Sequence, residues 1–196
     1  MQRSTDRIYT THVGSLARPS ALLDLMRAAA AGEPVDETER AEAERQAVAD
    51  VVARQRSAGL DVISDGEQTK TGHDAPLAEY VDTLFTIRAG AFSFEAANPR
   101  HEHVYHVFES VKPPRDAVLL PGVISHAANI VEHPDTIADR IVRFAELVGR
   151  ENVVASADCG FSSQATYRPE IHPQIVWAKF ESLAEGARRA SARLWN

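Results

Sequence analysis

The stretch Asn152-Val153-Val154-Ala155-Ser156-Ala157 is followed directly by Asp158-Cys159-Gly160-Phe161. The first part is short and apolar, as expected of a buried strand, and the glycine marks the point where such a strand would end. Parallel α/β proteins build their sites where strands end. The stretch therefore predicts a buried parallel strand that carries an acid and the single cysteine of the chain to a functional edge.

Four further segments have the composition of strands, and helical segments lie between them. The expected strands cover residues 8–15, 60–64, 91–95, 117–124 and 152–157. The expected helices cover residues 21–28, 36–58, 76–88, 134–148 and 173–194. Alternation of strand and helix is typical of a parallel sheet with crossover helices, so we expect one α/β domain over residues 1–196.

Composition narrows the classes of partner. The 196 residues are 44% hydrophobic and 25% charged, and no apolar run approaches the roughly 20 residues that span a bilayer. The start of the chain lacks the apolar stretch of a secretory signal, so we expect a cytoplasmic protein with no membrane partner. A net charge of −7 without a basic block argues against nucleic acid. The expected partners are small molecules and further copies of the chain.

Polar side chains gather where the expected strands end. They are Ser15, Asp65, Glu67, Glu95, His126, Asp158 and Cys159. Carboxylate, imidazole and thiolate are the ligand types of zinc, so Glu95 and Cys159 are candidate metal ligands. The alternative for Cys159 is a structural thiol that packs as a small apolar group. The sequence has no glycine-rich phosphate loop and no serine nucleophile elbow, which argues against nucleotide chemistry.

Histidine titrates near neutral pH and is the usual acid or base in enzymes. The candidates for this role are His12, His73, His101 and His126. His101-Glu102-His103 follows a proline, and it either lines a loop with ion pairs to Arg100 or contacts a substrate. Asp65 and Glu67 similarly either begin a helix or hold a substrate amine.

Four motifs carry a family resemblance. They are Thr10-Thr11-His12-Val13-Gly14-Ser15 with Arg18-Pro19, Ala58-Gly59-Leu60-Asp61-Val62-Ile63-Ser64-Asp65-Gly66-Glu67-Gln68, Phe94-Glu95-Ala96-Ala97-Asn98-Pro99-Arg100-His101-Glu102-His103, and Asp158-Cys159-Gly160. In this order they resemble the catalytic barrel of cobalamin-independent methionine synthase. They are more similar still to the single-barrel relatives that include the epoxyalkane:coenzyme M transferases. The resemblance extends over nearly the whole chain.

The resemblance implies a TIM barrel whose zinc stabilises the thiolate of a thiol substrate, which then attacks a methyl donor or an epoxide carbon. By motif, Glu95 and Cys159 correspond to two of the zinc ligands. Asp65 and Glu67 correspond to the segment that contacts the amino-acid part of the substrate. The remaining residues that the resemblance places around the substrate are Ser15, Asn98, Arg100, His103 and Asp158.

One motif of that family is missing. Its His-x-Cys pair of zinc ligands lies between the second and third motifs, where this chain has only Thr71-Gly72-His73-Asp74. We therefore expect an internal deletion near residues 71–73. The length agrees, because a complete barrel takes about 250 residues and rarely fewer than about 200. The expected fold is a shortened TIM-barrel-like α/β fold of about five parallel strands, completed by oligomerisation because exposed strand edges need partners.

Three functions follow as hypotheses. The first is methyl or alkyl transfer to a thiol, with a zinc site that lacks its full set of about three protein ligands unless His73, His101 or His126 supplies one. The second is a metal-free lyase, isomerase or cyclase that uses histidine as acid and base. The third is a binding or assembly protein without catalysis.

Overall fold

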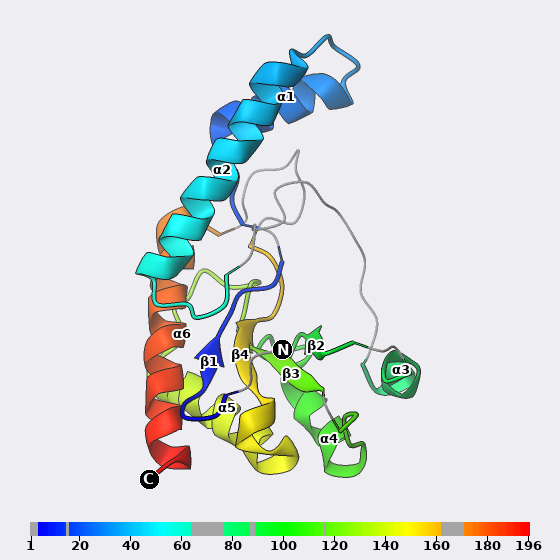
Figure 1. Cartoon of the computed structure of the whole chain (residues 1–196), viewed down its shortest axis with the longest axis vertical. Helices are drawn as coiled ribbons and strands as arrows, with labels where there is room; N and C mark the ends of the chain where they lie inside the picture. The colour runs from blue at the N-terminus through cyan, green and yellow to red at the C-terminus, as the bar shows by residue number, and fades with distance from the viewer. Residues whose placement is uncertain (1–3, 15, 64–76, 87–88, 116, 162–170) are drawn as a thin grey trace.

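A parallel sheet of four strands, in the order β1-β4-β3-β2, lies at the centre of the computed structural model (Figure 1). The described residues are 4–14, 16–63, 77–86, 89–115, 117–161 and 171–196. The strands are β1 (Tyr9–Thr10), β2 (Ala91–Phe94), β3 (Val118–Ile124) and β4 (Val154–Ala157). Every neighbouring pair is parallel, which confirms the α/β class expected from the alternating pattern.

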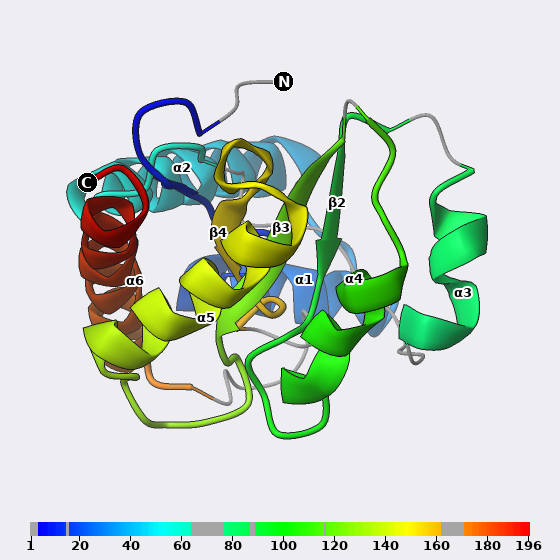
Figure 2. The same cartoon turned by 90° about the horizontal axis from the view of Figure 1, so that it is seen from below.

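Helices connect the strands. They are α1 (Ser20–Ala30), α2 (Glu37–Ser57), α3 (Leu77–Leu84), α4 (Val107–Ser110), α5 (Pro134–Val148) and α6 (Pro173–Leu194), with 3-10 turns at Glu102–His106 and Arg150–Asn152. Figures 1 and 2 place α6 beside β1 and α3 at the opposite end of the sheet, beside β2. None of the described helices is both long and apolar enough to cross a membrane.

The two long C-terminal helices begin with the same local chemistry. The Nδ1 atom of His133 accepts the backbone N–H of Asp135, and Nδ1 of His172 accepts that of Gln174. A proline occupies the first helical turn in each, where its fixed φ favours a helix and its missing N–H costs nothing. These starts confirm the expected boundaries at residues 134 and 173.

The core lies between the sheet and its helices. All seven residues of β3 are buried, as expected of a central strand covered on both faces. The helices α5 and α6 pack closely, because a Cβ atom on Gly186 of α6 would lie only 2.5 Å from the Cγ2 atom of Ile137 on α5. Phe180 and Ile141 are fully buried.

The described residues form four strands, compared with the expected count of about five. Of the segment 60–64, only Val62 joins the sheet, through a single parallel bridge to Thr11 beside β1. Ser64 lies outside the described residues, as does the expected deletion point at 71–73. Among the described residues, the parallel sheet therefore runs in the order β1, β4, β3, β2, and the single bridge of Val62 lies at its β1 edge.

Candidate functional site

Three polar side chains meet at the carboxyl edge of the sheet. Glu95 follows β2, His126 comes shortly after β3, and Asp158 follows β4. One possible ligand atom from each lies within 4.8 Å of the others. The strand-end pattern in the sequence predicted this meeting, because carboxyl ends of parallel strands share one edge.

Asp158 holds the backbone of the turn that follows β2, across the intervening strand β3. Its Oδ1 atom accepts the N–H groups of Ala96 and Ala97, each at 2.7 Å. Its Oδ2 atom accepts the N–H of Asn98 at 2.7 Å and the Nδ2 donor of the same residue at 2.9 Å. Burial raises the pKa of this carboxyl, against the opposing effect of these donors. Four bonds use the lone pairs of both oxygens, so the geometry supports an anchoring role in place of direct substrate binding.

Gly122 provides the space that Asp158 needs. A Cβ atom at this position would lie 2.2 Å from Asp158 Oδ1 and 2.5 Å from Asp158 Cα. We expect Gly122→Ala to lower the free energy of unfolding by roughly 2–3 kcal/mol, because the backbone of Asp158 cannot swing aside. Urea unfolding measures the change. The control is Ser93→Ala at an exposed position of β2, and an equal loss in both variants would contradict the steric argument.

One carboxylate oxygen of Glu95 is held by neighbouring side chains, and the other lies on the side of His126. Its Oε2 atom accepts Asn98 Nδ2 at 2.7 Å and lies 2.8 Å from His101 Nδ1. Its Oε1 atom lies 3.9 Å from His126 Nδ1. That His126 nitrogen is buried and makes no hydrogen bond within the described part of the chain. Glu95 is thus fixed in orientation and faces an imidazole with an open lone pair or proton.

The loop that carries His126 is fixed by a buried ion pair. Glu132 Oε1 accepts the backbone N–H of Ser125 at 2.7 Å, and Glu132 Oε2 accepts Lys179 Nζ at 2.8 Å. The Lys179 side chain on α6 has no exposed surface. We did not identify Lys179 from the sequence. The available signal was its spacing from Val176 and Leu183, which places a lysine on the buried face of a helix.

Arg140 on α5 supports the other side of the site. Its guanidinium donates to the carbonyl oxygens of Val123 at 3.1 Å and Ala97 at 3.2 Å. It therefore ties the end of β3 to the turn that follows Glu95. Sequence reasoning missed this residue as well, because a lone arginine in a helical pattern is normally a solvated surface residue.

His12 is part of the core. Its side chain is fully buried between Phe161 and Phe180, with ring centroids 5.8 Å and 5.1 Å away. Its Nε2 atom donates to the carbonyl oxygen of Gly14 at 2.8 Å. Burial lowers its pKa to about 4. The acid–base role expected of His12 stays a prediction; among the described residues the imidazole is enclosed, and its Nε2–H is already bonded to the carbonyl oxygen of Gly14.

The buried His12 predicts a pH dependence of stability. Its folded pKa lies below the ordinary 6.5, so the unfolded chain binds more protons between pH 6.5 and about 4. The stabilising contribution is fully present above pH 6.5 and is lost as pH falls toward 4, by about 3 kcal/mol. We expect His12→Gln to remove this part of the dependence in urea unfolding at pH 7 and pH 4. His103→Gln, at an exposed position, should retain it, and identical profiles for wild type and His12→Gln would contradict the assignment.

The other predicted site residues divide into three groups. Asn98 and His101 are buried beside Glu95, as described above. Arg100, His103 and Cys159 are exposed, and Cys159 does not belong to the Glu95 group. A Cβ on Gly14 would lie 2.3 Å from the backbone nitrogen of Gly160, so the segment after Cys159 touches the segment after β1. The remaining candidates lie outside the described residues: Ser15, Asp65, Glu67 and His73.

The described residues match a zinc site in part. Two ligands at about 2.0 Å from zinc in tetrahedral geometry lie about 3.3 Å apart, close to the 3.9 Å between Glu95 Oε1 and His126 Nδ1. The third member of the group, Asp158, has its oxygens occupied by hydrogen bonds. A bound zinc would stabilise a substrate thiolate. The described residues supply two suitable ligands, fewer than the three of a catalytic zinc.

Comparison with known proteins gives the same class of fold. No family model matches the sequence, and no curated protein matches it. The structure of a B12-independent methionine synthase from Shewanella sp. W3-18-1, in complex with selenomethionine, is similar with a TM-score of 0.59 and 12% identity, over 96% of this chain and 99% of that chain. A putative vitamin-B12 independent methionine synthase from Listeria monocytogenes gives 0.56 and 14%, over 97% and 98%. At these identities the likeness shows the fold.

Proposed function

We propose that this chain transfers a methyl or alkyl group to the sulfur of a small thiol at the carboxyl edge of the sheet. The fold is similar to that of methionine synthase structures, and the motifs of the sequence resemble the same family. The observation that carries the proposal is the pairing of Glu95 Oε1 with His126 Nδ1, 3.9 Å apart at the ends of neighbouring strands. Such a pair can accept a proton and return it.

In the proposed reaction the thiol gives its proton to the Glu95 and His126 pair. The sulfur lone pair then forms a bond to the methyl or alkyl carbon while the bond from that carbon to its leaving group breaks. The leaving group departs with the bonding electron pair and takes the proton back from His126. Asn98 donates a hydrogen bond to Glu95 Oε2 and His101 Nδ1 lies 2.8 Å from the same oxygen, which leaves Glu95 Oε1 on the side of His126.

A second candidate is a metal-free lyase, isomerase or cyclase. The observation that favours it is the 2.8 Å approach of His101 Nδ1 to Glu95 Oε2, which gives the carboxylate an imidazole on each side. Two imidazoles around one carboxylate can serve as acid and base in the same turnover.

One experiment separates the candidates. Homocysteine and coenzyme M are titrated into the protein by calorimetry, with zinc and with a chelator, and the metal content of protein purified without a chelator is measured. Saturable thiol binding by the wild-type protein supports the first candidate, and Glu95→Gln should keep that affinity because its expected effect is on the chemical step. Failure of both thiols to bind contradicts it. Thiol binding that persists in the presence of the chelator shows that zinc is dispensable for binding. One equivalent of zinc in the wild type that is lost in Cys159→Ser would show that the set of zinc ligands is larger than the described residues indicate.

A further inference from the structure

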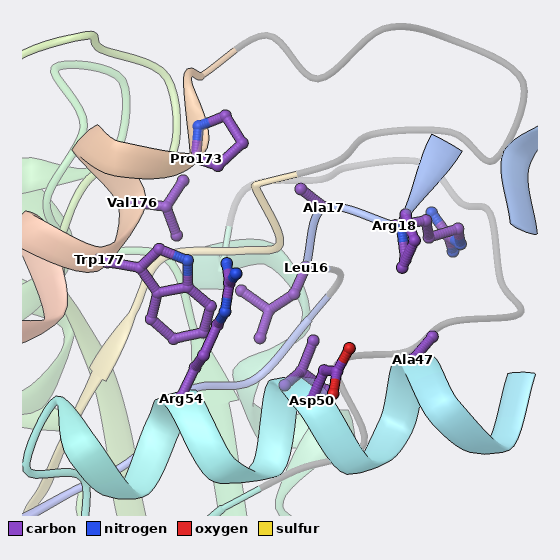
Figure 3. A pocket seen from close by; sticks show the side chains of 11 residues that line it. Leu16, Ala17, Arg18, Ala47, Asp50, Arg54, Pro173, Val176 and Trp177 are labelled. Atoms are coloured by element: carbon purple, nitrogen blue, oxygen red, sulfur yellow. The ribbon is translucent and has the colours of Figure 1, made fainter. Parts of the chain in front are cut away.

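A cavity lies away from the Glu95 group. It has a volume of about 420 Å³ and is bounded by the segment that follows β1, by α2 and by the start of α6 (Figure 3). Neither Glu95, His126 nor Asp158 lines it. Small-molecule sites typically have volumes of about 300–1,000 Å³, so the cavity can hold a compact ligand.

Most of the lining is apolar and comes from separate elements. Leu16 comes from the segment after β1, Val51 from α2, and Val176 and Trp177 from α6. Figure 3 shows Leu16, Val176 and Trp177 grouped around one end of the cavity. Leu16, Val51 and Val176 are buried and hold the walls in place. An indole beside aliphatic side chains favours a flat or branched apolar body.

The charged part of the lining favours an anion. Arg54 places its guanidinium 5.4 Å from the ring centroid of Trp177, and Arg18 lines the end of the cavity away from Trp177 in Figure 3. Among the described residues that line the cavity, one carries a carboxylate, Asp50, and it accepts a hydrogen bond from Gln46 Nε2 at 2.9 Å. Among the described residues, the Arg54 guanidinium forms no ion pair with Asp50, so it is available to an anionic ligand.

We propose that this cavity binds a small organic carboxylate with an aromatic or branched apolar body. The carboxylate pairs with the Arg54 guanidinium, whose planar fork matches two carboxylate oxygens. The apolar body lies against Leu16, Val176 and Trp177. The proposal does not depend on the chemistry at Glu95, because the two sites share no lining residue.

Fluorescence of Trp177 tests the proposal directly. The chain has two tryptophans, so Trp195→Phe leaves Trp177 as the single indole. Titration with benzoate should give a saturable change in emission. Benzamide has the same shape without the charge and should bind about ten-fold more weakly, since a charge-assisted pair is lost. Acetate has the charge without the body and should also bind more weakly. If Trp195→Phe does not fold, calorimetry on the wild type provides the same three affinities.

Two pairs of variants complete the test. Arg54→Ala should weaken benzoate binding about ten-fold, whereas Arg56→Ala, an exposed arginine on the same helix outside the lining, should leave it unchanged. Asp50→Asn should strengthen binding a few-fold, because it removes a like charge, whereas it should not change the affinity for benzamide. Equal affinities for benzoate and benzamide, equal effects of the two arginine variants, or no saturable signal would each overturn the proposal.

Discussion

Replacing Lys179 with methionine should lower the free energy of unfolding by about 3–5 kcal/mol. The lysine is fully buried, and its Nζ atom lies 2.8 Å from Glu132 Oε2. Methionine fills a similar volume but leaves the largely buried Glu132 carboxylate without its cation. The cost of an uncompensated charge exceeds what the apolar side chain gains. Urea unfolding at neutral pH measures the loss.

The chain provides a surface control for the Lys179 experiment. Arg188 on the same helix pairs with Glu185, and its side chain is 69% exposed. Arg188→Met should cost less than about 1 kcal/mol, because exposed ion pairs contribute little. Adding Glu132→Gln to Lys179→Met should restore part of the stability, since glutamine removes the charge and can still accept the Ser125 N–H. A double variant as unstable as Lys179→Met would contradict the ion-pair explanation.

Replacing Glu95 with glutamine should lower the rate of methyl or alkyl transfer to a thiol by at least about 100-fold. Glutamine retains the shape and one oxygen acceptor, but it cannot take up a proton or orient His126 as a base. The rate is measured by single-turnover transfer to homocysteine or coenzyme M under saturating thiol. A loss of rate with little change in thiol affinity would identify a role in the chemical step.

Glu109→Gln is the matched control for Glu95→Gln. Glu109 is an exposed carboxylate that also contacts a histidine, because its Oε1 atom lies 2.8 Å from His106 Nδ1. It takes no part in the Glu95 group, so this variant should keep the wild-type rate. If Glu95→Gln keeps the rate as well, the proposed function is wrong. If both lose it, the cause is a general effect of altered charge.

The elements that were predicted well have strong local patterns. Residues 117–124 and 152–157 are short apolar runs between turn residues, and the structure contains β3 and β4 at those positions. The helices α5 and α6 begin and end where proline and the apolar stripe predicted. Segment 60–64 was predicted as a full strand, yet among its described residues only Val62 bridges to β1. In a run of only five residues, the number of residues that pair with the next strand depends on the surrounding structure. The sequence pattern does not specify that number.

Part of the site was predictable, because strand ends in a parallel sheet share an edge. That rule placed Glu95, His126 and Asp158 together. It could not show that the carboxylate oxygens of Asp158 would accept hydrogen bonds from backbone N–H groups, because those bonds depend on the turn formed by residues 96–98. It could not reveal that His12 would be enclosed by Phe161 and Phe180, which come from distant parts of the chain. The homo-oligomer, the cytoplasmic location and the internal deletion stay predictions.

The adjacency of β1 and β4 has a consequence for how the chain reaches its folded state. Ser4, just before β1, donates its hydroxyl proton to the carbonyl oxygen of Val153, 149 residues later. The Trp195 indole donates to the carbonyl oxygen of Thr5 across 190 residues. Closing such long loops costs entropy before any contact is gained, and folding slows accordingly. We infer that α5, β4 and α6 assemble first and that the N-terminal strand docks late, against a surface already formed.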